Sequence, residues 1–140
     1  MVKTFSLTFI IVLILLLVLD LVWLGSTIDS LYKPNMPGLV ADKPNMIAGA
    51  AFYVLYAFGL TALIIHPSLF GPGKVSFLAL AAKAALFGLV AFATYDLTGL
   101  SVLKNWSLKL SLIDMAWGTF AATTASLGTG FILKLLGQLK

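Results

Sequence analysis

Four long apolar segments, joined by short stretches rich in Pro, Gly and Lys, constrain the fold of this sequence more than any other feature. Each segment has about 20 residues or more, and a helix of that length crosses about 30 Å of hydrocarbon at 1.5 Å per residue. The segments therefore predict four transmembrane helices. They cover residues 5–27, 46–66, 75–103 and 109–136, and residues 28–45 form the longest predicted loop.

The composition supports a lipid environment for these segments. Hydrophobic residues make up 61% of the 140-residue chain and charged residues only 10%, whereas a soluble domain usually has about 25% charged residues. A chain of this size cannot bury so much apolar surface against itself, so lipid must cover much of it. We predict an all-α integral membrane protein, a single four-helix transmembrane domain over residues 1–140 with up-down-up-down topology.

The positive charge comes from Lys alone, because the sequence has no Arg. The lysines are scattered singly at the ends of the apolar segments, where they would anchor to lipid headgroups. The expected partner is therefore the lipid bilayer and not a nucleic acid. The lysines are shared evenly between the two sides, so the positive-inside rule hardly distinguishes the two possible orientations. We predict the orientation with both termini in the cytoplasm.

Several kinds of site are disfavoured by what the sequence lacks. It has no Cys and no Glu and only one His, which argues against a transition-metal site. No cofactor is identified. Lys83 lies inside the third apolar segment, and its simplest interpretation is a side chain that reaches to the headgroups. A Schiff-base lysine is the alternative.

Three of the five aspartates, Asp20, Asp96 and Asp114, fall within apolar segments. A carboxylate at membrane depth costs about 2.5–3.5 kcal/mol, so such residues usually face the bundle interior. In the predicted topology all three lie roughly 8–12 Å below the same surface. Tyr53 and Tyr56 in the second helix reach the same depth. Each predicted helix thus contributes a polar group to one layer, which we call the acid layer.

Helical spacing suggests that the groups of the acid layer converge. Trp23 follows Asp20 by three residues and Trp117 follows Asp114 by three, so each pair shares a helix face. Indole and phenol groups can donate hydrogen bonds to carboxylates, and the hydroxyl-bearing neighbours of Asp96 are expected to do the same. The predicted ligand-binding residues are Asp20, Trp23, Tyr53, Tyr56, Tyr95, Asp96, Thr98, Asp114 and Trp117.

The last apolar segment has a second regularity, a row of small residues at intervals of four. Such a row lets a neighbouring helix approach closely. We predict helix packing, and not catalysis, along the ridge formed by Gly118, Ala122, Ser126 and Gly130.

These motifs resemble a family of small bacterial membrane proteins predicted to have four helices, the domain-of-unknown-function family 2177. The resemblance spans nearly the whole chain, and the family carries no assigned biochemistry. It implies a multi-pass protein of a bacterial cytoplasmic membrane. Its most specific segments are Thr94-Tyr95-Asp96-Leu97-Thr98 and Asp114-Met115-Ala116-Trp117-Gly118-Thr119, with Leu19-Asp20-x-x-Trp23 and Phe52-Tyr53-x-Leu55-Tyr56 in support. Gly99 departs from the family pattern, which often has Asn there.

Three functions remain open at this point. The acid layer favours the binding or permeation of a cation, a proton or a polar small molecule, because it offers carboxylates and aromatic groups without a strong nucleophile. A structural or accessory subunit, as a homo-oligomer or within a larger membrane complex, is the second hypothesis. A lipid-modifying enzyme with an aspartate as general acid or base is the third. Under the first hypothesis the aspartates bind a ligand. Under the second they only hold the helices together through hydrogen bonds.

Overall fold

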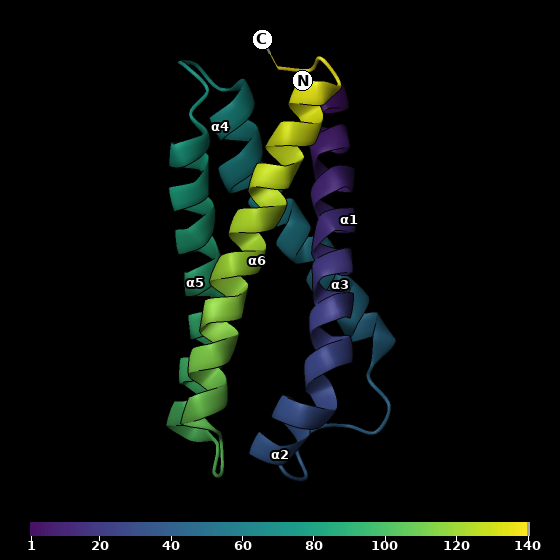
Figure 1. Ribbon diagram of the computed structural model, residues 1–140, viewed down its shortest axis with the longest axis vertical. Coiled ribbons are helices and arrows are strands. Elements are labelled where there is room, and N and C mark those ends of the chain that lie inside the picture. The colour runs from purple at the N-terminus through teal and green to yellow at the C-terminus, as the bar shows by residue number, and fades with distance from the viewer. Residues whose placement is uncertain (140) are drawn as a thin grey trace.

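The computed structural model describes residues 1–139, and these form the predicted all-α bundle of helical rods (Figure 1). The rods run up and down in sequence, and the two ends of the chain lie at the same end of the bundle. The first rod consists of α1 (Val2–Thr27), η1 (Ile28–Tyr32) and α2 (Lys33–Asn35), and the second of α3 (Met46–Gly59), η2 (Leu60–Ile65) and α4 (His66–Phe70). The third is α5 (Phe77–Val102) and the fourth is α6 (Leu108–Leu135).

The rods are long and apolar enough for a membrane protein. Among residues 1–139, three helices meet the length and hydropathy expected of a span: Val2–Asn35, Met46–Phe70 and Phe77–Val102. α6 has 28 residues, which is also enough to cross, but its many small and hydroxyl-bearing residues make it less apolar. This difference follows from position, because α6 packs against both α5 and α1 and carries much of the buried surface (Figure 1).

The first rod extends beyond the predicted boundary. Residues 28–45 were expected to form a loop because of their prolines, but the helix continues to Asn35 and the connection is shorter. Pro34 is accommodated by the π-helical turn η1, in which the Lys33 N–H group bonds to the Ile28 carbonyl, five residues back. A proline lacks the N–H of the normal helical bond, so the widened turn just before it keeps the rod continuous.

The second rod also contains a π-helical segment before a proline. It was expected to end at residue 66, but it runs through Pro67 to Phe70. The π-helical segment η2 ends at Ile65, two residues before this proline, and the His66 N–H group bonds to the Thr61 carbonyl. Both π segments thus end two residues before a proline, which explains why a proline did not end either helix.

The starts of α3, α5 and α6 have side-chain caps that the sequence encodes. The Asn45 side chain accepts hydrogen bonds from the Ile47 and Ala48 N–H groups at the start of α3. Ser76 and Ser107 cap α5 and α6 in the same way. Such caps satisfy N–H groups that have no partner in the first turn of a helix. They place the starts of these helices within two residues of the predicted positions.

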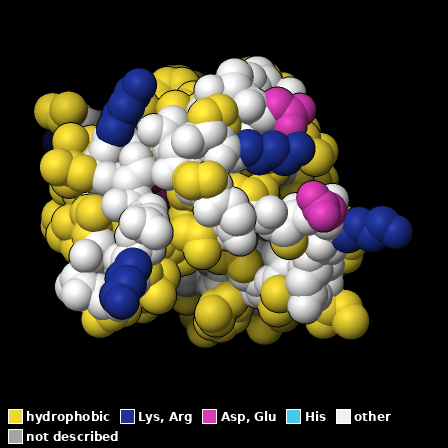
Figure 2. Space-filling model, turned by 90° about the horizontal axis from the view of Figure 1, so that it is seen from below, with side chains coloured by type: hydrophobic (Ala, Val, Ile, Leu, Met, Phe, Trp, Pro, Cys, Tyr) yellow, Lys and Arg dark blue, Asp and Glu magenta, His cyan; other side chains and the backbone are white. Residues whose placement is uncertain are grey.

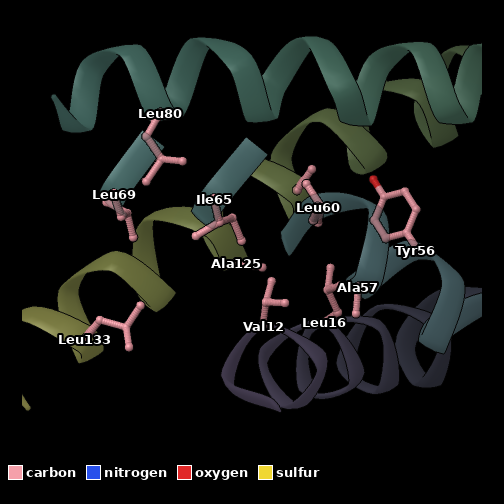
Figure 3. Close-up of a cluster of buried hydrophobic side chains, with 11 residues drawn as sticks. Val12, Leu16, Tyr56, Ala57, Leu60, Ile65, Leu69, Leu80, Ala125 and Leu133 are labelled. Carbon is pink, nitrogen blue, oxygen red and sulfur yellow. The ribbon is translucent and has the colours of Figure 1, made fainter. Parts of the chain in front are cut away.

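An apolar core joins the rods on the side of the chain termini. Figure 3 shows Val12 and Leu16 of α1 facing side chains of the second rod, with Tyr56 at one edge of the cluster. The outer surface remains apolar, since large side chains such as Leu21 and Leu135 are 72% and 87% exposed. A soluble monomer rarely exposes so much contiguous apolar surface, so these faces are the ones that lipid covers.

The lysines lie mainly at the ends of the bundle. Figure 2 looks onto the end that carries α2, where dark-blue side chains project around the rim. Lys33, Lys43, Lys104 and Lys109 are exposed there, next to Asp29 and Asp42. This arrangement matches the anchoring to headgroups that the sequence predicts.

The ridge of small residues on α6 is covered within the chain, by α5. A Cβ atom added at Gly88 of α5 would overlap the Gly118 carbonyl oxygen and lie 2.7 Å from the Ala122 Cβ. A Cβ at Gly118 would overlap the Phe92 ring, and one at Gly130 would lie 2.7 Å from the Phe77 ring. The close approach of α5 and α6 therefore needs these small residues, and it fixes which face of α6 is turned towards α1.

Candidate functional site

The two Asp-x-x-Trp motifs meet between α1 and α6. The Trp117 Nε1–H of α6 donates to Asp20 Oδ1 of α1, with a nitrogen–oxygen distance of 2.8 Å. The tryptophan of the second motif thus pairs with the acid of the first. This contact ties α1 to α6.

The tryptophan of the first motif reaches the acid of the second through a tyrosine. Trp23 Nε1–H donates to the Tyr32 hydroxyl oxygen at 3.0 Å, and the Tyr32 O–H donates to Asp114 Oδ1 at 2.5 Å. The Trp23 and Trp117 rings lie stacked, with centroids 4.4 Å apart and planes 6° apart. The two motifs are therefore cross-linked twice, once directly and once through Tyr32.

Tyr32 was missed by the sequence analysis because it lies in the segment that was assigned to a loop. The π turn η1 carries it as a continuation of α1, which brings its hydroxyl back towards the membrane interior. One sequence signal was available: residues 28–32 contain no Pro or Gly, and the first proline comes only at position 34.

Asp96 is the most deeply buried acid, with 2% of its surface exposed. Its carboxyl group lies within hydrogen-bonding reach of the Asp114 carboxyl and close to Ser111 and Trp106. Its Oδ2 atom is buried and has no N–H or O–H partner. Buried polar atoms normally have a hydrogen-bond partner, so this oxygen is an open acceptor in the bundle interior.

Trp106 and Ser111 are two further residues that the sequence analysis did not select. The Trp106 Nε1–H donates to Ser111 Oγ at 3.0 Å. The indole lies against Gly99, where a Cβ would come within 2.5 Å of the ring. The lack of a side chain at Gly99 thus makes room for the Trp106 ring, which lies close to Asp96.

Tyr53 and Tyr56 of α3 approach the acid layer from the side of Asp20. The Tyr53 hydroxyl lies within hydrogen-bonding reach of the Asp20 carboxyl group. Tyr56 is 9% exposed, and its ring packs against Phe52, Phe87 and Phe92. Its hydroxyl oxygen is buried without a hydrogen-bond partner. The second rod therefore contributes two phenol groups: the Tyr53 hydroxyl is within reach of Asp20, and the Tyr56 hydroxyl has no hydrogen-bond partner.

Two predicted residues do not join the acid layer. Thr98 is exposed, and Tyr95 is 61% exposed with its ring edge against Trp106. They were expected to surround Asp96 with hydroxyl groups. Residues one or two positions away on an α-helix point in other directions, so burying Asp96 turns Thr98 outwards and leaves Tyr95 at the edge.

The described part of the chain offers two separate acidic subsites. Among residues 1–139 no group of three or more His, Cys, Asp or Glu side chains converges on one point. Asp96 and Asp114 form a close pair, whereas Asp20 has its own donors, Trp117 and Tyr53. A hydrogen bond between two carboxyl groups requires that one of them carry a proton, so the pair is suited to holding one.

The comparisons with known proteins place the chain in a family. No curated protein and no solved structure matches it. A family model, DUF2177, matches residues 5–131 and is described as a predicted membrane protein. The match reaches into all four rods and includes both Asp-x-x-Trp motifs and the Asp96 segment. The chain therefore belongs to the DUF2177 family of predicted membrane proteins.

Proposed function

We propose that this protein binds a proton within the membrane, at the Asp96–Asp114 pair, and that a small cation can take the place of the proton. The observation that carries the proposal is the buried Asp96 carboxyl group, with an unpartnered Oδ2 next to a second acid. Intramembrane acids of this kind mark proton or ion sites in many membrane proteins.

The surroundings of the pair support a site that exchanges its occupant. Asp114 accepts a hydrogen bond from Tyr32, so its charge has one fixed donor, while Asp96 Oδ2 has none. Two neighbouring carboxyl groups that share one proton behave as a single titrating unit. A small cation held between the carboxylates would neutralise the same charge.

Asp20 has a different role in this proposal. Its carboxylate is held by Trp117 and lies near Tyr53, so its hydrogen bonds are satisfied by the protein. We assign it to helix–helix attachment. The acid layer is then divided into a structural half at Asp20 and a binding half at Asp96 and Asp114.

Infrared difference spectroscopy of the protein in lipid bilayers tests the assignment. The band of a protonated carboxyl group should appear and disappear as the pH is changed, and Asp96→Asn and Asp114→Asn should each remove this change. Asp29→Asn is the matched control, because Asp29 is exposed and pairs with Lys33 at the rim. A pH-dependent band that survives unaltered in both buried variants would contradict the proposal.

A series of cations tests whether a small cation can replace the proton at the Asp96–Asp114 pair. Thermal unfolding in Na⁺, K⁺ and choline at several pH values should show stabilisation by the small cations only where the pair has lost its proton. Asp96→Asn and Asp114→Asn should abolish this stabilisation. Unfolding temperatures of the wild-type protein that are the same across the whole series would exclude cation binding.

A structural role is the second candidate function, and it is favoured by the links between α1 and α6. Trp23, Tyr32, Asp114, Trp117 and Asp20 satisfy one another directly. The small-residue ridge is already occupied by α5, so a homo-oligomer or accessory subunit would need another face. Native mass spectrometry from mild detergent tests this role: an isolated monomer would count against it. No contact among residues 1–139 favours the lipid-modifying alternative.

We further propose that the protein lies in a bacterial cytoplasmic membrane with both termini in the cytoplasm. The resemblance of the motifs to a mainly bacterial family supports the location, and both ends of the chain lie at one end of the bundle (Figure 1). The sequence lacks Cys, so Lys74→Cys and Lys104→Cys report on opposite ends. An impermeant thiol reagent added to whole cells should label the second and not the first.

A further inference from the structure

A groove open to the lipid lies on the outer face of the bundle, between α5 and η2. It has a volume of about 470 Å³ and is lined by Ile64, Lys83, Leu86, Phe87, Val90 and Ala91. Five of these six residues are apolar, and Lys83 is the only charged one. The volume is within the range of about 300–1,000 Å³ typical of small-molecule sites.

The groove has a direction relative to the membrane. Its α5 residues lie zero, three, four, seven and eight positions after Lys83, which is the spacing of a stripe along one helix face. Lys83 lies six residues after the start of α5 at Phe77, and Ala91 lies about 12 Å deeper along the axis. The cation is therefore at the shallow end of the groove, and the apolar end points to the middle of the bilayer.

Among residues 1–139, Lys83 has no acidic partner. The ion pair found among residues 1–139 joins Lys33 and Asp29 at the far end of the bundle. Asp96, the acid on the same helix, lies about 20 Å from Lys83 along α5. The other aspartates belong to the acid layer or to the segment around α2. A second copy of the chain would thus offer Lys83 no aspartate at this depth.

We propose that this groove binds an anionic phospholipid, with one acyl chain along Leu86, Phe87, Val90 and Ala91 and the phosphate group paired with Lys83. A lysine at this depth reaches towards the headgroups by extending its aliphatic stem, which places its ammonium group at the phosphate level. Basic pockets between transmembrane helices attract anionic headgroups. The charge of Lys83 and the apolar lining of the groove thus both favour an anionic phospholipid. This site is independent of the proposed proton site.

Native mass spectrometry of the full chain in detergent tests the proposal, with dioleoyl phosphatidylglycerol and dioleoyl phosphatidylcholine as probes. The anionic lipid should bind more tightly than the zwitterionic one. Lys83→Gln should weaken binding of the anionic lipid about fivefold, the effect of one lysine charge at a membrane surface. Lys83→Arg should retain the preference. Lys74→Gln, which removes an exposed charge outside the groove, should leave the preference unchanged.

A second variant tests the apolar part of the site. Ala91→Phe fills the deep end of the groove and leaves Lys83 in place, so it should reduce binding of the anionic lipid by blocking the acyl chain. Ala91 is partly buried and packs against the core as well as lining the groove, so circular dichroism and thermal unfolding of the variant check that the bundle still packs. Equal lipid preference in the wild-type protein and Lys83→Gln would overturn the proposal, as would unchanged binding by Ala91→Phe.

Discussion

The indole rings of Trp23 and Trp117 stack face to face between α1 and α6, with centroids 4.4 Å apart and planes inclined by 6°. Each ring donates its N–H group to the opposite motif: Trp117 directly to Asp20, and Trp23 to Tyr32, which in turn donates to Asp114. The stack is therefore the centre of a cross-connected pair of Asp-x-x-Trp motifs. It connects Asp20 with the proposed binding pair, Asp96 and Asp114.

The stacked pair should show energetic coupling. In a double-mutant cycle with Trp23→Leu and Trp117→Leu, we expect a coupling energy of about 1 kcal/mol, because offset aromatic pairs contribute beyond the area they bury. The free energy of unfolding in mixed lipid–detergent micelles is the measurement. A cycle of Trp23→Leu with Trp106→Leu is the control, since these residues belong to separate contacts. Additive effects for Trp23 and Trp117 would mean that the stack contributes nothing of its own.

Removal of the Tyr32 hydroxyl should destabilise the bundle. Tyr32→Phe leaves the Trp23 N–H group and Asp114 Oδ1 without their shared partner, and an unpartnered buried polar group costs about 1–3 kcal/mol. The unfolding free energy should fall by that amount. Tyr95→Phe removes an exposed hydroxyl and should change the unfolding free energy by less than about 0.5 kcal/mol. Equal effects of the two substitutions would show that Tyr32 lies outside the network.

Asp20 should tolerate loss of charge better than loss of its hydrogen-bond acceptor. Asp20→Asn keeps a carbonyl oxygen for the Trp117 N–H group, so little change in unfolding free energy is expected. Asp20→Leu removes the acceptor and leaves the Trp117 indole N–H without a hydrogen-bond partner, which should lower the unfolding free energy by about 1–3 kcal/mol. Near-ultraviolet circular dichroism, which reports on tryptophan packing, should change only in Asp20→Leu. A large effect of Asp20→Asn would instead point to a functional charge at this position.

The contact of α5 with α6 should depend on Gly118. A Cβ at this position overlaps the Phe92 ring, so Gly118→Ala should lower the unfolding free energy by about 1–3 kcal/mol. Phe92→Leu in the same chain should restore part of the loss. Gly25→Ala is the matched control, because no heavy atom lies within 4 Å of a Cβ placed there and alanine favours a helix by up to about 1 kcal/mol. Equal losses for both alanine variants would contradict close packing at Gly118.

Much of the candidate site was predictable from depth alone. Asp20, Asp96 and Asp114 stand out because a carboxylate in an apolar helix must face the interior, and Trp23 and Trp117 follow them on the same helix faces. The partners of these acids were less predictable. Thr98 lies two residues from Asp96, but the helix turns it towards the outside. Ser111 and Trp106, which lie next to Asp96 instead, come from the next helix and its preceding turn.

The sequence by itself determined that this chain forms a helical membrane bundle, and it predicts that the three acids of its apolar segments lie at one depth. These properties depend on hydrophobicity and on rise per residue, which are local. Only the tertiary structure decided which groups meet, because the rotation of each helix about its axis is set by packing, such as that of Phe92 on Gly118. It also decided that the first helix passes Pro34 through a π turn, which brings Tyr32 to Asp114. A proline signals a break locally, and whether the helix continues depends on the contacts beyond it.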